Sequence, residues 1–186
     1  MLYTPNIRLI YPSMDPTWYI IRHSLATRST SGYGDQILDA SILPDTVPAI
    51  EEMAGYLHTI GDSINVSSEL LRCRQTAAII TAKTGKQFIF DKRLNEFVEE
   101  PPKFVTETFV DFKARVISFV QTISRTNSER IIVVTHGAVV SALMHYIVQG
   151  DVTENELLDY PDCGVMITIH HTSVTQKDFR ITKGTL

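Results

Sequence analysis

The sequence predicts an α/β fold, a three-layer α/β/α sandwich with a mainly parallel central sheet. Short apolar runs of the length of buried strands alternate along the chain with longer segments of helical periodicity. This alternation favours parallel strands joined by right-handed crossovers. With 186 residues and 44% hydrophobic content, the chain is long enough for one well-packed domain and short for two. We therefore expect a single domain over residues 1–186.

The amino-terminal quarter of the chain predicts an extended arm, a strand and a loop. Residues 1–16 are interrupted by three prolines, which indicates an extended arm. The apolar run at 18–21 is typical of a buried strand. Residues 24–44 are rich in Ser, Thr, Gly and Asp, the composition of a loop.

Two helices are expected next, each with residues suited to its ends. Thr46 can cap a helix over 46–60, and Ser68 can cap a helix over 70–82. Gly85 fits the end of the second helix, because glycine readily adopts the left-handed conformation found there. The strands expected between and after these helices lie at 64–66 and 88–90.

The second half of the chain continues the alternation. Apolar residues recur with helical period over 106–124, which predicts an amphipathic helix. The apolar run 130–135 predicts a second central strand, followed by a helix over 138–148. Two further runs, 165–170 and 175–181, are typical of a hairpin at a sheet edge.

Bulk composition excludes several classes of protein. A net charge of −4 lacks the basic excess of a nucleic-acid-binding protein. Two cysteines without a CxxC spacing give neither a disulfide framework nor a zinc motif. No apolar stretch approaches the ~20 residues that cross a bilayer, and the amino terminus lacks the apolar core of a secretory signal. We expect a reduced, cytoplasmic protein with no nucleic-acid or membrane partner.

Cationic and nucleophilic side chains follow the two central strands at their ends. Arg22 and His23 come directly after the first strand, and His136 and Gly137 after the second. Ligands of open α/β sheets gather outside the carboxyl ends of the strands, so these residues predict one anion site. Arg72 falls in the first turn of its helix, where free backbone N–H groups also favour an anion.

A metal ion is the competing use of paired histidines. A metal site needs about three ligands, with carboxylates or thiolates at recognisable spacing. Here arginines accompany the histidines, and their charge repels a cation. We therefore expect neither a metal ion nor another cofactor.

Three segments resemble the histidine phosphatase superfamily, also called the phosphoglycerate mutase-like family. Its members carry Arg-His-Gly after the first strand, a segment like Ser-x-Leu-x-Arg-Ala-x-Gln-Thr at a helix start, and a late strand ending in His-Gly. This chain has, in the same order, Arg22-His23-Ser24, Ser68-Glu69-Leu70-Leu71-Arg72-Cys73-Arg74-Gln75-Thr76 and Thr135-His136-Gly137. The resemblance extends over residues 18–148 and implies the same fold.

The resemblance implies a metal-independent phosphatase in which His23 accepts the phosphoryl group as phosphohistidine. A neutral imidazole attacks well near pH 7 when an acceptor holds its other ring nitrogen. Phosphoryl transfer depends mainly on positioning and on neutralising charge. The groups implied to bind the phosphoryl oxygens are Arg22, Arg72, His136 and the backbone N–H of Gly137.

The family's general acid lies in a Leu-x-Glu segment, which Leu94-Asn95-Glu96 matches. A carboxyl group near a dianionic phosphate is pushed towards its protonated form, as a general acid requires. The resemblance therefore implies that Glu96 protonates the leaving group and then activates water. Glu99 and Glu100 are the competing carboxylates, which we expect to be solvated.

Ser24 departs from the family, which usually has glycine there. Its hydroxyl can donate to the phosphate, or its side chain can disturb the site. A non-catalytic phosphate-binding module is therefore the alternative to a phosphatase. A phosphoglycerate mutase-type phosphotransferase is the third possibility, disfavoured by the short connection after Glu96 and by the lack of the mutases' Trp-Asn pair. We expect the substrate to be a phosphorylated small molecule or a phosphoprotein.

Overall fold

The structure, a computed structural model, describes residues 15–27, 33, 36–98 and 107–180. In these ranges it has one six-stranded sheet with the order β3-β2-β4-β1-β5-β6. β1 and β2 both pair in parallel with β4, and β3 in parallel with β2, whereas β5 and β6 are antiparallel to their neighbours. The strands are β1 Thr17–Arg22, β2 Ile64–Ser67, β3 Ile89–Phe90, β4 Arg130–Thr135, β5 Val165–His170 and β6 Ser173–Asp178.

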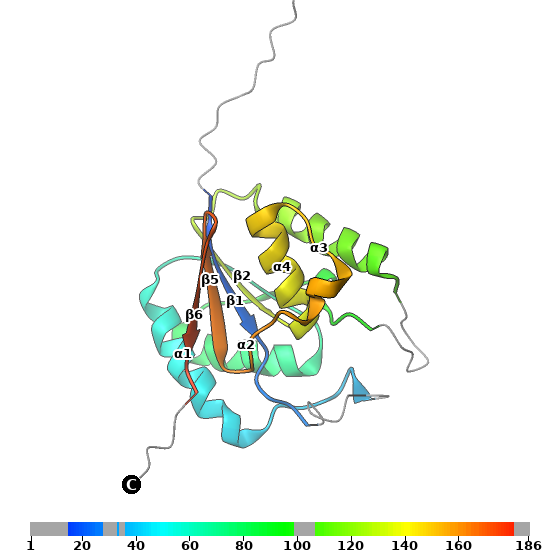
Figure 1. Ribbon diagram of the computed structural model, residues 1–186. Coiled ribbons are helices and arrows are strands. Elements are labelled where there is room, and N and C mark those ends of the chain that lie inside the picture. The colour runs from blue at the N-terminus through cyan, green and yellow to red at the C-terminus, as the bar shows by residue number, and fades with distance from the viewer. Residues whose placement is uncertain (1–14, 28–32, 34–35, 99–106, 181–186) are drawn as a thin grey trace, which may run out of the picture.

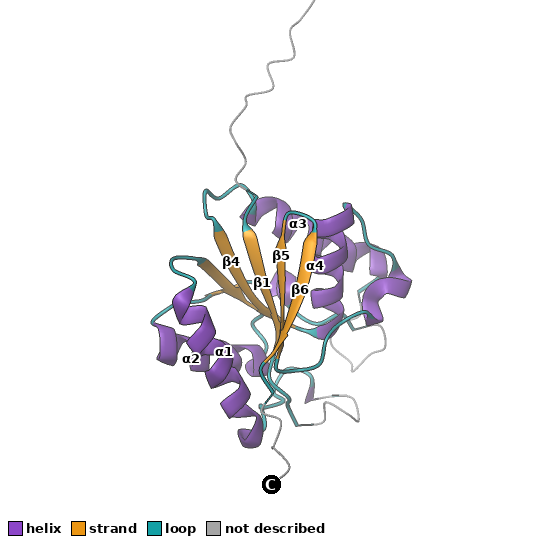
Figure 2. Cartoon of the chain, turned by 60° about the vertical axis from the view of Figure 1, so that its left-hand side comes forward, coloured by secondary structure: helices purple, strands orange, loops and turns teal. Residues whose placement is uncertain are grey.

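Helices connect these strands and cover both faces of the sheet. The α-helices are α1 Val47–Thr59, α2 Leu71–Thr84, α3 Phe109–Ile123 and α4 Gly137–Gln149, and the 3-10 turns are η2 Pro44–Thr46, η3 Lys92–Leu94 and η4 Glu154–Leu158. α1 and α2 lie on one face of the sheet, and α3 and α4 on the other (Figures 1 and 2). The predicted α/β sandwich with a mainly parallel sheet is thus confirmed.

The alternation of side chains along β1 divides the core into two halves. Trp18 and Ile20 pack in the cluster that contains the apolar face of α3 and α4. Tyr19 and Ile21 pack with α1 and α2 instead. Successive side chains of a strand point to opposite faces, so a strand buried on both sides is apolar at every position. This is why β1 has an unbroken apolar run before its charged end.

Three helix ends differ from the sequence-based expectation. Thr46 precedes α1, but its hydroxyl donates to the carbonyl of Leu43 at 2.7 Å instead of capping the helix. Ser68 was the wrong cap for α2, because the helix begins at Leu71 and the residue before it is Leu70. α3 begins at Phe109, where Thr108 caps it by accepting from the N–H of Asp111 at 3.2 Å.

Other expectations agree more closely with the structure. Gly85 ends α2 in the left-handed conformation, with φ of 76°. The hairpin is present as β5 and β6, and β6 begins and ends earlier than the predicted 175–181. Position 181, the first fourteen residues of the expected arm, the loop positions 28–32 and 34–35, and residues 99–106 lie outside the described residues.

Candidate active site

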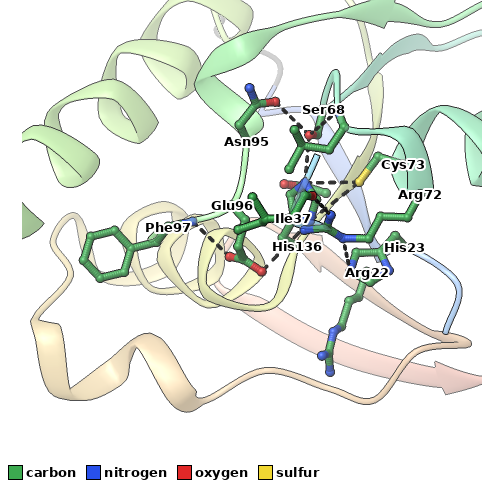
Figure 3. Close-up of polar contacts among 12 residues, drawn as sticks. Arg22, His23, Ile37, Ser68, Arg72, Cys73, Asn95, Glu96, Phe97 and His136 are labelled. Carbon is green, nitrogen blue, oxygen red and sulfur yellow. Dashed lines mark hydrogen bonds and ion pairs between the residues drawn. The ribbon is translucent and has the colours of Figure 1, made fainter. Parts of the chain in front are cut away.

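The two central strands bring the two histidines together. β1 and β4 run in parallel with Arg22 opposite Thr135, so both strands end at the same level. The N–H of His23 donates to the carbonyl of Thr135 at 2.8 Å and extends this pairing by one residue. The rings of His23 and His136 lie 5.2 Å apart between centroids, at an angle of 60° (Figure 3).

The imidazole of His23 has a fixed tautomer. Its Nδ1 lies 2.7 Å from the carbonyl oxygen of Ser24. A carbonyl oxygen only accepts, so Nδ1 carries the proton and Nε2 keeps its lone pair. Burial, then the charge of Arg72, lower the pKa of His23 to about 3, against an opposing effect of the Ser24 hydrogen bond. The ring is therefore neutral at physiological pH.

Arg72 lies at the start of α2 and is fully buried beside this imidazole. Its Nε donates to Nε2 of His23 at 3.1 Å, and its Nη1 donates to the carbonyl of Ile37 at 2.5 Å. The guanidinium lies over the ring of Tyr33, 4.2 Å from its centroid. Nη2 is buried and has no hydrogen-bond partner among the described residues. A buried, unpartnered N–H of a guanidinium is costly and suits an anion.

Arg22 reaches the site from the end of β1 and is held by the loop before β5. Its Nη1 donates to the carbonyl of Pro161 at 3.2 Å, and its guanidinium lies 4.7 Å from the ring centroid of Tyr160. Its Nε is the second buried nitrogen without a partner in the described part of the chain. A Cβ at Gly137 would lie 3.0 Å from ring atoms of Tyr160, so glycine allows this tyrosine to approach the start of α4.

His136 is fully buried at the start of α4. Its Nε2 lies 2.8 Å from the hydroxyl of Ser68 and 3.3 Å from Sγ of Cys73. Its Nδ1 lies 4.0 Å from Oε2 of Glu96. Burial, followed by the charge of Arg72, holds the pKa of His136 well below its usual range. Without a bound anion, this second imidazole is also neutral.

Glu96 lies in the segment after η3, on the Nδ1 side of His136 and away from Ser68 and Cys73. Its Oε1 accepts from the N–H of Phe97 at 3.0 Å. Burial raises the pKa of Glu96, and the charge of Arg72 opposes this effect. Arg115 of α3 anchors the segment by donating to the carbonyl of Arg93 at 2.6 Å and to that of Glu96 at 3.4 Å. The result is a carboxyl group that is fixed beside His136 and whose pKa is raised above its ordinary value.

Ser24 lies next to His23, but its hydroxyl is directed elsewhere. The hydroxyl of Thr46 donates to Leu43, so the 2.7 Å contact between Ser24 and Thr46 has Ser24 as the donor. Outside glycine, the only positive φ among the described residues is that of His171. Serine therefore fits this backbone position without strain. Its proton is used by Thr46 and not by the site.

Comparison with known proteins identifies the family. The model of the histidine phosphatase superfamily (branch 1) matches residues 18–99 and 97–180. The chain belongs to this superfamily. Superfamily membership confirms the resemblance seen in the sequence and implies phosphorylated substrates. No curated protein sequence matches the chain.

Solved structures share the fold at low identity. α-Ribazole phosphatase from Shigella flexneri is 16% identical, with a TM-score of 0.72 over 87% of this chain and 95% of its own. Phosphoglycerate mutase from Bacillus anthracis is 16% identical, with a TM-score of 0.65 over 89% of this chain and 96% of its own. The protein histidine phosphatase SixA, solved with tungstate, is 14% identical, with a TM-score of 0.60 over 87% of this chain and 94% of its own.

Within this histidine phosphatase superfamily protein, the structure brings together most of the residues singled out in the sequence. The side chains of His23, Arg72 and His136 form one buried cluster with the partly exposed Glu96 against it, and Arg22 lies at its edge beside Gly137 and Tyr160. Among the described residues, no group of three or more His, Cys, Asp or Glu side chains is placed to hold a metal ion. None of the described helices has the length and apolar character needed to cross a bilayer.

Several residues that contact and support this cluster were not predicted from the sequence. Ser68 and Cys73 stand inside the second motif, yet nothing in the motif indicates that both contact His136. Asn95 lies between the two matched positions of the Leu-x-Glu segment and bonds to Ser68 at 2.8 Å. Tyr160 has no motif, and its role depends on the glycine at the start of α4. The only sequence signal for Ser68, Cys73 and Asn95 was their position next to residues of the recognised motifs.

Proposed function

We propose that this protein is a metal-independent phosphatase that hydrolyses phosphate monoesters through a phosphohistidine on His23. One observation carries the proposal. A neutral imidazole, with its proton fixed on Nδ1, presents the lone pair of Nε2 beside a buried guanidinium that has an unpartnered N–H. This is the combination that nucleophilic attack on a phosphate dianion requires.

In the first step, Nε2 of His23 attacks phosphorus, the N–P bond forms, and the bond to the leaving oxygen breaks. The carbonyl of Ser24 accepts from Nδ1 at 2.7 Å and stabilises the positive charge that the ring gains. Arg72 and Arg22 bind the non-bridging oxygens, because guanidinium matches phosphate geometry and neutralises its charge. Glu96, protonated at the start, gives its proton to the leaving oxygen.

In the second step, water attacks the phosphorus of phosphohistidine. Glu96, now a carboxylate, takes a proton from this water as the P–N bond breaks and phosphate leaves. His23 regains its neutral form with the proton still on Nδ1, and Glu96 is protonated again. His136 and the N–H of Gly137 at the start of α4 bind phosphoryl oxygens in both steps.

The structure gives no support for the idea that Ser24 disables the chemistry. Its φ is not positive and its hydroxyl donates to Thr46, so it neither strains the site nor enters it. The substrate we propose is a phosphorylated small molecule or a phosphoprotein. The solved relatives include both kinds, an α-ribazole phosphatase and a protein histidine phosphatase.

The test is hydrolysis of p-nitrophenyl phosphate in the presence of EDTA, with vanadate as inhibitor. We expect turnover that resists EDTA, is blocked by vanadate and is lost in His23→Ala. His58→Ala is the matched control, since His58 is an exposed histidine on α1. Turnover that persists in His23→Ala would refute the proposal, and phosphate-dependent stabilisation without turnover would favour the non-catalytic binding module.

A further inference from the structure

A chain of hydrogen bonds leads from Asn95 through Ser68 to His136 (Figure 3). We propose that Asn95 is a positioning residue, which through Ser68 fixes the proton of neutral His136 on Nε2 and leaves Nδ1 as the atom that gains a proton. The proposal rests on the proposed function for its effect on turnover. The hydrogen-bond pattern itself does not depend on any activity.

The orientation of the Asn95 amide is fixed by its two neighbours. One amide atom of Asn95 lies 3.1 Å from the backbone nitrogen of Glu69 and 2.8 Å from the hydroxyl of Ser68. The N–H of Glu69 can only donate, so the atom facing it must be the oxygen Oδ1. This oxygen accepts from both neighbours, and the proton of the Ser68 hydroxyl is therefore directed to Asn95.

The Ser68 hydroxyl has one proton to donate and two lone pairs that accept hydrogen bonds. The proton of Ser68 is used by Asn95, and one lone pair accepts from the N–H of Leu70 at 3.3 Å. The other lone pair faces Nε2 of His136 at 2.8 Å. For this contact to be a hydrogen bond, Nε2 must carry the proton. Both Ser68 and His136 are fully buried, so two lone pairs that face each other with no proton between them would be costly here.

The tautomer of His136 determines how its ring can bind a phosphoryl oxygen. With the proton on Nε2, the lone pair of Nδ1 is on the side of the Glu96 carboxyl, 4.0 Å away. The ring then becomes a donor to a phosphoryl oxygen only when Nδ1 takes up a proton, which gives a charged and stronger hydrogen bond. Binding of a phosphate dianion is thereby coupled to proton uptake at His136.

The groups that influence this proton come from every element around the ring. They are Arg72 and Cys73 of α2, Arg22 and His23 at the end of β1, Glu96 of the segment after η3, and Arg115 of α3. The three arginines oppose protonation until the anion neutralises part of their charge, whereas the carboxylate form of Glu96 favours it. Cys73 stays a thiol, because burial raises its pKa.

Two substitutions at one position separate the acceptor from the shape of the side chain. Asn95→Leu has a similar size but no acceptor, so the Ser68 hydroxyl is free to donate to Nε2 of His136, and the proton moves to Nδ1. Asn95→Asp keeps an acceptor oxygen for Ser68 and Glu69. Asn65→Leu is the matched control, because Asn65 accepts from Ser63 at 2.7 Å near the start of β2.

The direct readout is the tautomer of His136, measured from its ring nitrogen chemical shifts in the ¹⁵N-labelled full-length protein. We expect the Nε2–H form in the wild type, Asn95→Asp and Asn65→Leu, and the Nδ1–H form in Asn95→Leu. An Nδ1–H form in the wild type overturns the proposal and needs no variant. If Asn95→Leu fails to fold, Ser68→Ala replaces it, and retention of a single Nε2–H form there also contradicts the proposal.

Turnover and phosphate binding supply the second readout. We expect kcat of Asn95→Leu to fall roughly tenfold or more, as for other partners that fix a histidine tautomer, with recovery in Asn95→Asp. Calorimetry with inorganic phosphate in buffers of different ionisation enthalpy should show proton uptake in the wild type and less in Asn95→Leu. If Asn95→Leu changes the tautomer of His136 but the wild type shows no turnover, the proposed function is refuted and the role of Asn95 stands. If the wild type shows turnover but Asn95→Leu leaves the tautomer of His136 unchanged, the role of Asn95 is refuted and the proposed function stands.

Discussion

Arg72 donates from Nε to Nε2 of His23 across 3.1 Å, so the proposed nucleophilic nitrogen is held by the residue that we propose to bind the phosphate. In the proposed mechanism, the lone pair is released for attack only when this N–H turns to a phosphoryl oxygen. The second guanidinium nitrogen, Nη2, is already buried without a partner among the described residues. In the proposed mechanism, substrate binding and activation of the nucleophile are therefore linked through one guanidinium.

Replacement of Arg72 tests this link. In Arg72→Lys a single ammonium cannot reproduce the planar fork, and at least two charge-assisted hydrogen bonds are lost. We expect kcat/KM for p-nitrophenyl phosphate to fall about 100-fold, equivalent to about 3 kcal/mol. Arg74→Lys is the control, since Arg74 is exposed and donates to the carbonyl of Glu69. An equal loss in both variants would show that the effect is not specific to the site.

Glu96→Gln should separate the two chemical steps. p-Nitrophenolate leaves without a proton, so its release in the first step is slowed little, whereas the second step loses its base. We expect a burst of about one equivalent of p-nitrophenol followed by slow turnover, measured by stopped flow. An alkyl phosphate, which needs the acid, should lose roughly 100-fold or more in kcat without a burst. Equal losses with both substrates would argue against Glu96 as the acid.

Gly137→Ala should disturb the loop that holds Arg22. The added methyl group would lie 3.0 Å from the ring of Tyr160, which must then move away from the start of α4. We expect a loss of roughly 1–3 kcal/mol in the free energy of unfolding, together with weaker phosphate binding. Gly55→Ala in α1 is the control, because its added Cβ has no neighbour within 4 Å apart from the adjoining residues and the backbone of its own helix. Alanine there should leave stability unchanged or raise it by up to about 1 kcal/mol.

The buried neutral histidines predict a loss of stability in acid. The folded pKa of His23 is lowered from 6.5 to about 3, so below pH 6.5 the unfolded chain binds a proton that the folded chain does not. Stability present above pH 6.5 is then lost as pH falls, by up to about 1.4 kcal/mol per pH unit for each such histidine. Glu96 opposes this, because its raised pKa lets the folded state bind a proton first.

Urea unfolding at about pH 7 and about pH 5 measures the effect of pH on stability. The wild type should lose more stability between the two values than His23→Asn, which has no titrating ring at this position. Asparagine retains a donor for the carbonyl of Ser24, which limits other changes at the site. A wild type and a variant with the same pH dependence would contradict the assignment of His23 as a buried neutral imidazole.

The sequence was sufficient to predict the elements and the residues at the strand ends. His23 and His136 were predictable as neighbours because parallel strands end at one edge of the sheet. Ser68 illustrates what was not predictable. Locally it is a good helix cap, but α2 begins three residues later and its hydroxyl turns to His136 and Asn95. Such contacts between residues far apart in the chain depend on packing that no local pattern encodes.

The proposed mechanism requires that a phosphoryl group be transferred to one nitrogen of His23. Its most direct test is to mix the full-length protein with substrate, quench it in alkali, and locate the phosphoryl group by mass spectrometry of its peptides. We expect the added mass on the peptide containing His23, accumulating further in Glu96→Gln and absent in His23→Asn. Rapid turnover with the phosphoryl group on another residue, or with no phosphorylated enzyme in Glu96→Gln, would contradict the account.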